Sequence, residues 1–171
     1  MPRARSKGVG GHQRAYRGLS DDWLTPPEIL RRLGPFDLDP CCPPSMPWRT
    51  ANWMVSAPAD GLNVDWEGRV WLNPPYGPET KSWLMRLADH GNGIALIFAR
   101  TETEMFHRLV WRMATALLFL EGRLHFRRLD GTRAPFNAGA PSVLVAYGES
   151  NAEILKNCGI DGAFVSGAIF R

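Results

Sequence analysis

The stretch Arg69-Val70-Trp71-Leu72-Asn73-Pro74-Pro75-Tyr76-Gly77 decides how the rest of the chain is arranged. Residues 69–72 predict a short buried strand, which must end at the two prolines because proline has no N–H to donate to a sheet ladder. The polar Asn73 and the aromatic Tyr76 are therefore expected at the carboxyl edge of a strand. In open α/β sheets this edge is where ligands bind.

The tetrapeptide at this edge is suited to hold an amino group. The side-chain oxygen of Asn73 and the backbone carbonyl of Pro74 can each accept a hydrogen bond, so together they match an amino group with two hydrogens. Tyr76 offers a flat face on which a planar ring can stack, and the prolines hold the acceptors in fixed geometry. The alternative interpretation is a proline-rich turn after a core strand.

The segments on either side alternate between strand and helix patterns. The continuous apolar run at residues 94–99 is typical of a strand buried on both faces, as in parallel sheets. We therefore predict an α/β fold with one mostly parallel sheet and flanking helices, whereas residues 43–66 are expected to be irregular. Further strands are predicted at 36–39, 116–120, 142–147 and 163–165, and helices after Thr25, at 79–89, through 105–110 and at 151–155.

Polar groups mark the ends of other predicted elements. Thr25 is expected to cap a helix that begins at Pro26, and Glu28 would complete a capping box. The free N–H groups at the start of this helix suit a carboxylate or phosphate. Helix capping alone also explains the stretch. Asp39 ends a strand before a tight loop, where a carboxylate can meet a cofactor. Because Pro, Cys and Ser replace the usual glycines after it, a dinucleotide-binding fingerprint is ruled out. Arg100 is a further charge at this edge.

Residues 122–133 predict a β-hairpin with a basic tip. Leu124 and Phe126 alternate with polar residues, and Asp130-Gly131 is a turn signal. A solvated hairpin without a partner is the alternative to a role in binding phosphate groups. The residues that suit phosphate contacts are Arg123, His125, Arg127, Arg128 and Arg133.

Composition limits the class of protein. The chain has 171 residues, 44% of them hydrophobic and 22% charged, which fits one soluble globular domain over residues 20–171. It has no apolar run of membrane-spanning length and no signal-peptide core, so a cytoplasmic protein without a membrane partner is expected. The three cysteines and four histidines have neither disulfide-framework nor metal-ligand spacing, so no metal site is predicted.

The first 19 residues read as a basic tail. They contain five basic residues and no acid, with several glycines and few large apolar side chains. Such a segment cannot bury enough surface to fold, so residues 1–19 are predicted to be disordered. A basic tail attracts polyanions such as nucleic acid, and a purely solubilising tail is the alternative.

Several short motifs occur in a characteristic order along the chain. They are Trp23-x-Thr25-Pro26, Phe36-Asp37-Leu38-Asp39-Pro40-Cys41, Asp60-Gly61-Leu62, Asp65-Trp66, Gly68-Arg69-Val70-Trp71-Leu72-Asn73-Pro74-Pro75-Tyr76-Gly77, Ala99-Arg100-Thr101, Gly122-Arg123-Leu124-x-Phe126 and Pro141-Ser142-Val143-Leu144-Val145. In order and spacing they resemble the short, Dam-like phage DNA N-6-adenine methyltransferases, over about residues 21–147.

The resemblance implies a Rossmann-like methyltransferase fold that uses S-adenosylmethionine, encoded by a phage or prophage and acting on DNA in the cytoplasm of a bacterial host. It places cofactor-binding roles on Thr25, Pro26, Asp39, Pro40, Cys41 and Asp65, and catalytic roles on Asn73, Pro74, Pro75 and Tyr76. The glycines that usually follow the first cofactor motif are missing here. The arginines at the ligand edge and on the basic hairpin are the expected DNA contacts: Arg100, Arg123, Arg127, Arg128 and Arg133.

The implied reaction is direct methyl transfer to the N6 amino group of an adenine that is flipped out of the duplex. No covalent cysteine intermediate is needed. Base reading must fall to loops such as 43–66 and 123–133, because the chain is too short for a large separate recognition domain. Two alternatives stay open: a methyltransferase that acts on an amide in protein or an amino group in RNA, and a catalytically silent DNA-binding protein. A monomer and a homodimer are both compatible with the sequence.

Overall fold

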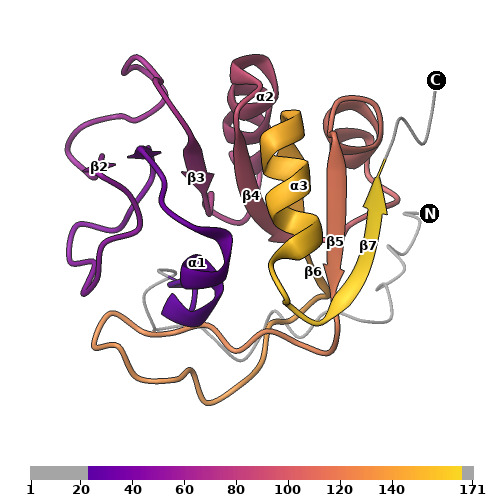
Figure 1. Cartoon of the computed structure of the whole chain (residues 1–171). Helices are drawn as coiled ribbons and strands as arrows, with labels where there is room; N and C mark the ends of the chain where they lie inside the picture. The colour runs from indigo at the N-terminus through magenta and orange to yellow at the C-terminus, as the bar shows by residue number, and fades with distance from the viewer. Residues whose placement is uncertain (1–22, 167–171) are drawn as a thin grey trace, which may run out of the picture.

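The computed structural model describes residues 23–166, which form a seven-stranded sheet in the order β2-β1-β3-β4-β6-β5-β7 (Figure 1). The predicted disordered tail, residues 1–19, lies outside the described residues. The strands are β1 (Leu38–Asp39), β2 (Trp53–Met54), β3 (Val70–Leu72), β4 (Gly93–Phe98), β5 (Ala116–Leu120), β6 (Ser142–Tyr147) and β7 (Gly162–Ser166).

Half of the neighbouring strand pairs described are antiparallel, so the sheet is less parallel than the sequence predicts. β1 pairs in parallel with β2 and β3, and β3 pairs in parallel with β4. β6 runs antiparallel to β4 and β5, and β7 runs antiparallel to β5. The apolar run of β4 conceals this difference, because a strand buried on both faces has the same composition whichever way its neighbours run.

The pairing defines one edge of the sheet at which β1, β3 and β4 end. β6 starts at this edge, since Ser142 pairs with Phe98 at the end of β4. β5 also ends here, where Leu120 pairs with Gly162 at the start of β7. We call this side the carboxyl edge and the opposite side the amino edge.

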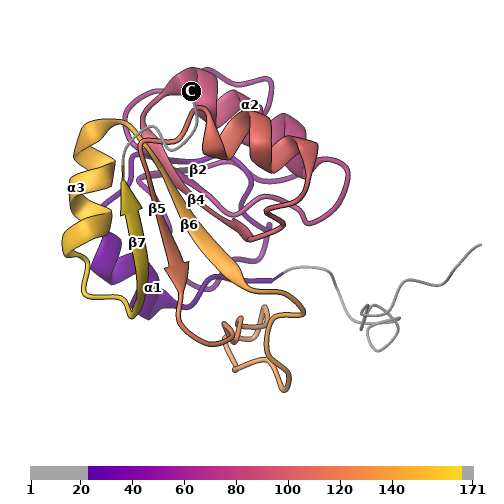
Figure 2. The same ribbon diagram turned by 90° about the vertical axis from the view of Figure 1, so that its right-hand side faces the viewer.

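Helices cover both faces of the sheet, α2 and η1 on one and α1 and α3 on the other (Figure 2). They are α1 (Pro27–Leu33), α2 (Thr80–His90), the π-helix η1 (Phe106–Trp111) and α3 (Glu149–Asn157). Val70 and Leu72 belong to the core cluster under α2, whereas Trp71 between them belongs to the cluster under α1 and α3. Burial on both faces is why β3 reads as a continuous apolar run. None of the helices in residues 23–166 is long and apolar enough to cross a membrane.

One strand lies within the segment that the sequence predicts to be irregular. β2 pairs with β1 through Trp53–Leu38 and Met54–Asp39. It escapes prediction because it has only two residues and because Trp53 is exposed rather than buried. The strand covers the outer side of β1 and so encloses Asp39 from that direction.

The β5–β6 loop, residues 121–141, contains isolated bridges instead of the predicted β-hairpin. Arg127 bridges to Leu24 on one side and to Arg133 on the other. Both backbone groups of Arg127 bond to Leu24, at 3.0 and 2.9 Å, whereas its neighbours bond across the loop, Arg128 N–H to the carbonyl of Thr132 at 2.9 Å and Ala134 N–H to the carbonyl of Phe126 at 2.8 Å. Arg127 thus lies between two other segments, and the pairing within the loop is limited to this one bridge. The loop runs beyond the carboxyl edge and past α1 (Figure 1).

The amino edge is held together by a hydrogen-bond network around Arg69 and Asn151. Arg69 Nε donates to Asn151 Oδ1 at 2.6 Å, and its Nη1 donates at 2.9 and 2.8 Å to two carbonyls at and just beyond the end of α1. Its guanidinium also lies 4.2 Å over the ring of Phe36. The amide nitrogen of the fully buried Asn151 donates to Asn92 Oδ1 and to the carbonyl of Tyr147, both at 2.8 Å.

Candidate active site

Asn73 follows β3 directly, and its side chain is held in one orientation. Its amide nitrogen donates to the backbone carbonyl of Trp23 at 2.7 Å. Its amide oxygen accepts a hydrogen bond from the hydroxyl of Tyr76 at 3.3 Å. Because a carbonyl can only accept, the contact with Trp23 places the nitrogen on that side and leaves the oxygen facing Tyr76. The half-buried Asn73 therefore presents an oriented oxygen acceptor at the carboxyl edge.

The proline turn after Asn73 is fixed by a threonine at the start of α2. The hydroxyl of Thr80 donates to the carbonyl of Pro75 at 2.6 Å and accepts from the N–H of Gly77 at 3.1 Å. Pro74 is buried, whereas Pro75 is exposed. Thr80 is absent from the residues predicted from sequence; a hydroxyl residue within one helical turn of the tetrapeptide is the signal that could have found it.

Tyr76 belongs to an aromatic cluster, which sequence reasoning also missed. Its ring stacks on Phe98 with centroids 4.1 Å apart and planes 18° apart, and its centroid lies 6.0 Å from that of Phe126 with the two planes at 66°. Phe126 in turn lies 6.2 Å from Trp23. One face of the Tyr76 ring is therefore already covered, and only the face turned away from Phe98 can receive another planar ring. Burial raises the pKa of Tyr76, so its hydroxyl stays protonated and can donate.

Asp39 ends β1 as a buried carboxylate, with 4% of its surface exposed. One oxygen accepts a hydrogen bond from the hydroxyl of Thr50, and the other accepts from the N–H of Cys41 at 3.2 Å. Burial raises the pKa of Asp39 to about 6, and the two hydrogen bonds oppose this shift. Asp39 forms no ion pair within residues 23–166. It is thus a buried acid that lacks a cationic partner in the described part of the chain.

Cys41 connects the end of β1 to the tetrapeptide. Its thiol donates to the backbone carbonyl of Asn73 at 3.3 Å. Burial raises the pKa of this thiol well above its usual value, and the Asp39 carboxylate adds to the shift, so the sulfur is a neutral donor and not a nucleophile. Beside it, the carbonyl of Pro40 approaches Gly61 so closely that a Cβ there would lie 1.7 Å from the oxygen, which explains the glycine.

Thr25 lies before α1 but does not cap it, contrary to the prediction. The helix begins at Pro27, one residue later than expected, so Pro26 occupies the N-cap position and no side chain caps the helix. Thr25 is 2% exposed, and its hydroxyl has no hydrogen-bond partner within the described residues. The same is true of Ser142 at the start of β6. A buried polar group without a partner costs about 1–3 kcal/mol, so both hydroxyls suit a ligand that satisfies them.

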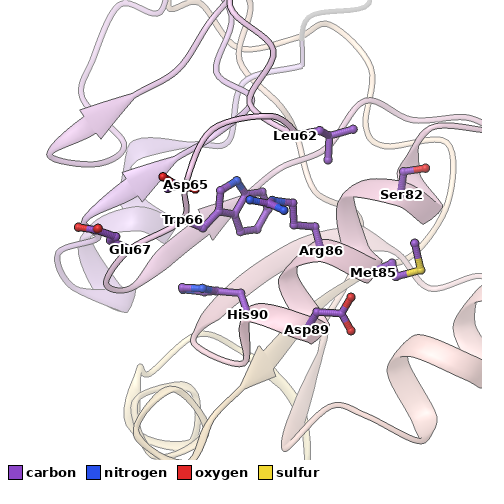
Figure 3. A pocket seen from close by; sticks show the side chains of 9 residues that line it. All are labelled: Leu62, Asp65, Trp66, Glu67, Ser82, Met85, Arg86, Asp89 and His90. Atoms are coloured by element: carbon purple, nitrogen blue, oxygen red, sulfur yellow. The ribbon is translucent and has the colours of Figure 1, made fainter.

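Asp65 lines a hollow that none of the other predicted cofactor residues lines (Figure 3). This hollow of about 600 Å³ lies between α2 and residues 62–67. There the Arg86 guanidinium lies 5.3 Å from the Trp66 ring, and His90 meets that ring edge-on at 6.0 Å. Neither Thr25 nor Asp39 lines it, so the structure does not bring Asp65 together with them.

Three of the five predicted DNA-binding arginines meet at one hollow. Arg123, Arg127 and Arg133 line a space of about 380 Å³ between the β5–β6 loop and Pro26 at the start of α1. Arg127 also forms an ion pair with Glu28 at 3.0 Å. Sequence spacing alone cannot show this grouping, because it depends on the contact between the loop and α1.

The remaining two arginines lie elsewhere. Arg100 is exposed just after β4, at the carboxyl edge. Arg128 is half-buried in the turn of the β5–β6 loop, where its N–H donates to the carbonyl of Thr132 at 2.9 Å. Arg100 therefore shares the edge of the sheet with Asn73, whereas Arg128 lies in the turn of the loop.

One family model matches the chain. It describes DNA N-6-adenine-methyltransferase (Dam) and matches residues 14–157, which include every site residue named above. No curated protein and no solved structure matches the chain. The match confirms the resemblance read from the motifs. Because it covers most of the sequence, the chain belongs to the DNA N-6-adenine-methyltransferase (Dam) family.

Proposed function

We propose that the protein transfers a methyl group from S-adenosylmethionine to the N6 amino group of adenine in DNA, in the cytoplasm of a bacterial host and from a phage or prophage gene. The observation that carries this proposal is the orientation of Asn73, whose amide nitrogen is fixed on the Trp23 carbonyl and whose oxygen is left as an acceptor. Membership of the family supports DNA adenine as the substrate. The adjacent parallel strands β1, β3 and β4, which end at the site, support a Rossmann-like reading of the sheet.

Asn73 and Pro74 act on the amino group that is methylated. The lone pair of the N6 nitrogen is delocalised into the adenine ring, so this nitrogen is a poor nucleophile. Hydrogen bonds from its two hydrogens to Asn73 Oδ1 and the Pro74 carbonyl favour a more tetrahedral nitrogen. The two oriented dipoles also stabilise the positive charge that builds up there in the transition state. The free face of Tyr76 stacks on the flipped base and offsets part of the cost of flipping it.

The polar groups of the carboxyl edge fit the proposed cofactor. When bound, S-adenosylmethionine supplies a methyl group activated by a sulfonium. Within residues 23–166, the buried hydroxyl of Thr25 lacks a partner and the Asp39 carboxylate lacks a cation. A ligand with hydroxyl and ammonium groups satisfies both. Pro40 and Cys41 shape the wall beside Asp39, whereas Asp65 lies outside this group and receives no contact in the proposal.

The arginine-lined hollow of the β5–β6 loop and Arg100 provide the DNA contacts in this proposal. Arg123→Ala and Arg133→Ala should each weaken DNA binding and lower the dependence of log affinity on log salt by about one unit. Arg112→Ala, an exposed cation just after η1, is the matched control. If both loop variants bind DNA with unchanged affinity and unchanged salt dependence, the loop is not part of the DNA interface.

The proposed activity is tested by mass analysis of nucleosides from cells that express the protein. We expect 6-methyladenine in DNA from cells with the unmodified chain and none with the Asn73→Ala variant. Methylation-sensitive sequencing of the same DNA then gives the recognition sequence. DNA without 6-methyladenine overturns the proposal, and 6-methyladenine confined to RNA identifies RNA as the substrate instead.

A further inference from the structure

The sheet has two outer strands, and they differ in how well they are protected (Figure 1). Proteins protect an outer strand by keeping it very short or by placing charges, prolines or bulges in it. β2 has only two residues, and the Arg49 side chain donates to the carbonyl of Asn52 just before it. β7 has five residues, Gly162–Ser166, in unbroken register with β5, and it contains neither a charge nor a proline. β2 is therefore protected by its length, whereas β7 has none of these features.

The backbone of β7 presents hydrogen-bonding groups on its outer side. The N–H of Glu121 donates to the carbonyl of Asp161 at 3.0 Å, one step beyond the last pair of the β5–β7 ladder. In an antiparallel ladder, pairs bonded in this way alternate with pairs that do not bond to each other. Alternate residues of β7 therefore direct their backbone groups away from β5, where no other strand pairs with β7 within residues 23–166. These residues are Gly162, Phe164 and Ser166.

The side chains of β7 are suited to face a second copy of the same strand. Phe164 packs against the core cluster under α1 and α3, and Val165 packs against the cluster under α2 and η1, but both are only half-buried. An antiparallel copy that places Phe164 opposite itself also places Ala163 opposite Val165. Every facing pair is then uncharged, and apolar cross-strand pairs stabilise a sheet. The outer side of β7 is thus complementary to itself.

We propose that two copies of the protein associate through β7, antiparallel and side by side, so that the sheet continues from one copy into the other. The outward N–H and C=O groups of each strand bond to those of the other, which removes the exposed edge. A twofold axis through the Phe164 pair relates the copies, and this is the commonest symmetry of homodimers. The inference uses none of the groups assigned to DNA or to the cofactor, so it stands or fails independently of the proposed function.

The dimer determines how the two candidate active sites are directed. β7 starts at the carboxyl edge, where Gly162 pairs with Leu120, and runs toward the amino edge. Because the two copies of β7 are antiparallel, the carboxyl edge of one copy adjoins the amino edge of the other. The two Asn73 side chains therefore lie at opposite sides of the joined sheet. On the proposed function, each copy then acts on its own stretch of DNA.

Sedimentation velocity of the full chain tests the dimer. As protein concentration increases, the measured mass should rise from that of one chain to that of two. Ser166→Pro removes an outward N–H and leaves the pairing with β5 intact, so it should raise the dimer dissociation constant at least about tenfold. Ser166→Ala keeps the N–H and should dimerise normally. A wild type that stays monomeric, or a proline variant that dimerises as well as the alanine variant, overturns the proposal.

A second variant and an exchange measurement test β7 separately. Ala163→Lys places a charge on the strand at an exposed position and should weaken the dimer, whereas Ser82→Lys adds the same charge on α2 and should not. Hydrogen exchange at the Phe164 N–H should slow as the dimer forms, while the Val165 N–H, which points toward β5, should be protected at every concentration. If the dimer forms without any change at Phe164, the interface lies elsewhere and the role of β7 is overturned.

Discussion

Asn151 at the amino edge of the sheet and two hydroxyls at the carboxyl edge are all buried, but they differ in whether protein atoms bond to them. At the amino edge, Asn151 is fully buried, and both ends of its amide are bonded to protein atoms: Arg69 on the oxygen, and Asn92 and Tyr147 on the nitrogen. At the carboxyl edge, the hydroxyls of Thr25 and Ser142 are as deeply buried but have no partner in the described chain. The Asn151 amide therefore stabilises the fold, whereas the hydroxyls of Thr25 and Ser142 suit a ligand.

Two asparagines show the contrast most directly. Asn73 is half-buried and uses its amide nitrogen to fix its orientation, so that its oxygen remains usable. Asn151 uses every part of its amide within the protein. We propose that the same residue type acts on the substrate at one edge and supports the fold at the other, because the two side chains differ in burial and in the number of their hydrogen bonds.

The largest expected effect is the loss of activity in Asn73→Ala. Methylation should fall by at least about 100- to 1,000-fold, because one of the two oriented acceptors is removed from the transition state. Cofactor binding should survive, since the groups assigned to the cofactor are untouched. A labelled-methyl assay and calorimetric titration measure the two quantities. Near-normal turnover would show that Asn73 does not act on the substrate.

The matched substitution at the amino edge, Asn151→Ala, should instead destabilise the fold by about 2–4 kcal/mol, because it leaves buried partners such as Arg69 Nε unpaired. The rate of methylation per folded molecule should change little. Urea unfolding measures the first effect, and turnover at low temperature measures the second. A large loss of turnover with normal stability in Asn151→Ala would contradict the structural role assigned to the amino edge.

Asp39→Asn should raise stability and lower cofactor affinity. The pKa of Asp39 is about 6 in the folded chain, above its ordinary value of 3.8, so the folded state holds the proton more tightly and stability falls as pH rises from about 4 to about 6. The variant does not titrate and should exceed the wild type by about 1–3 kcal/mol at pH 8. Urea unfolding at pH 4 and pH 8 checks this, and an equal difference at both pH values would contradict it.

The smallest expected effect is that of Thr25→Val, which exchanges a buried hydroxyl that has no partner among residues 23–166 for a methyl group of the same shape. Stability should stay constant or rise by up to about 1 kcal/mol, while cofactor affinity falls about 5- to 10-fold. Thr115→Val is the matched control, because the Thr115 hydroxyl accepts from the N–H of Gly148 at 3.0 Å. That variant should lose stability and keep its affinity; the reverse pattern would contradict the comparison.

Much of the fold could be predicted because it rests on local patterns. β3, β4, β5, β6 and α2 lie within one or two residues of their predicted limits, since the four strands are short continuous apolar runs and the apolar residues of α2 repeat with the helical period. β2 and the β5–β6 loop could not be predicted, because β2 depends on β1 for its pairing and the backbone of Arg127 bonds to Leu24. The antiparallel position of β6 between β4 and β5 could not be predicted either, because the composition of an apolar strand does not depend on the direction of its neighbours.

The sequence by itself determined that a strand ends at Asn73 and that the chain belongs to its family, because proline chemistry and motif order are properties of neighbouring residues. Only the tertiary structure decided that Trp23 orients the Asn73 amide, that Phe98 occupies one face of Tyr76, and that the Thr25 hydroxyl has no partner in the described part of the chain. These features are contacts between residues far apart in the chain. Whether a polar group has a hydrogen-bond partner depends on which distant atoms surround it after folding, and a local sequence pattern does not contain this information.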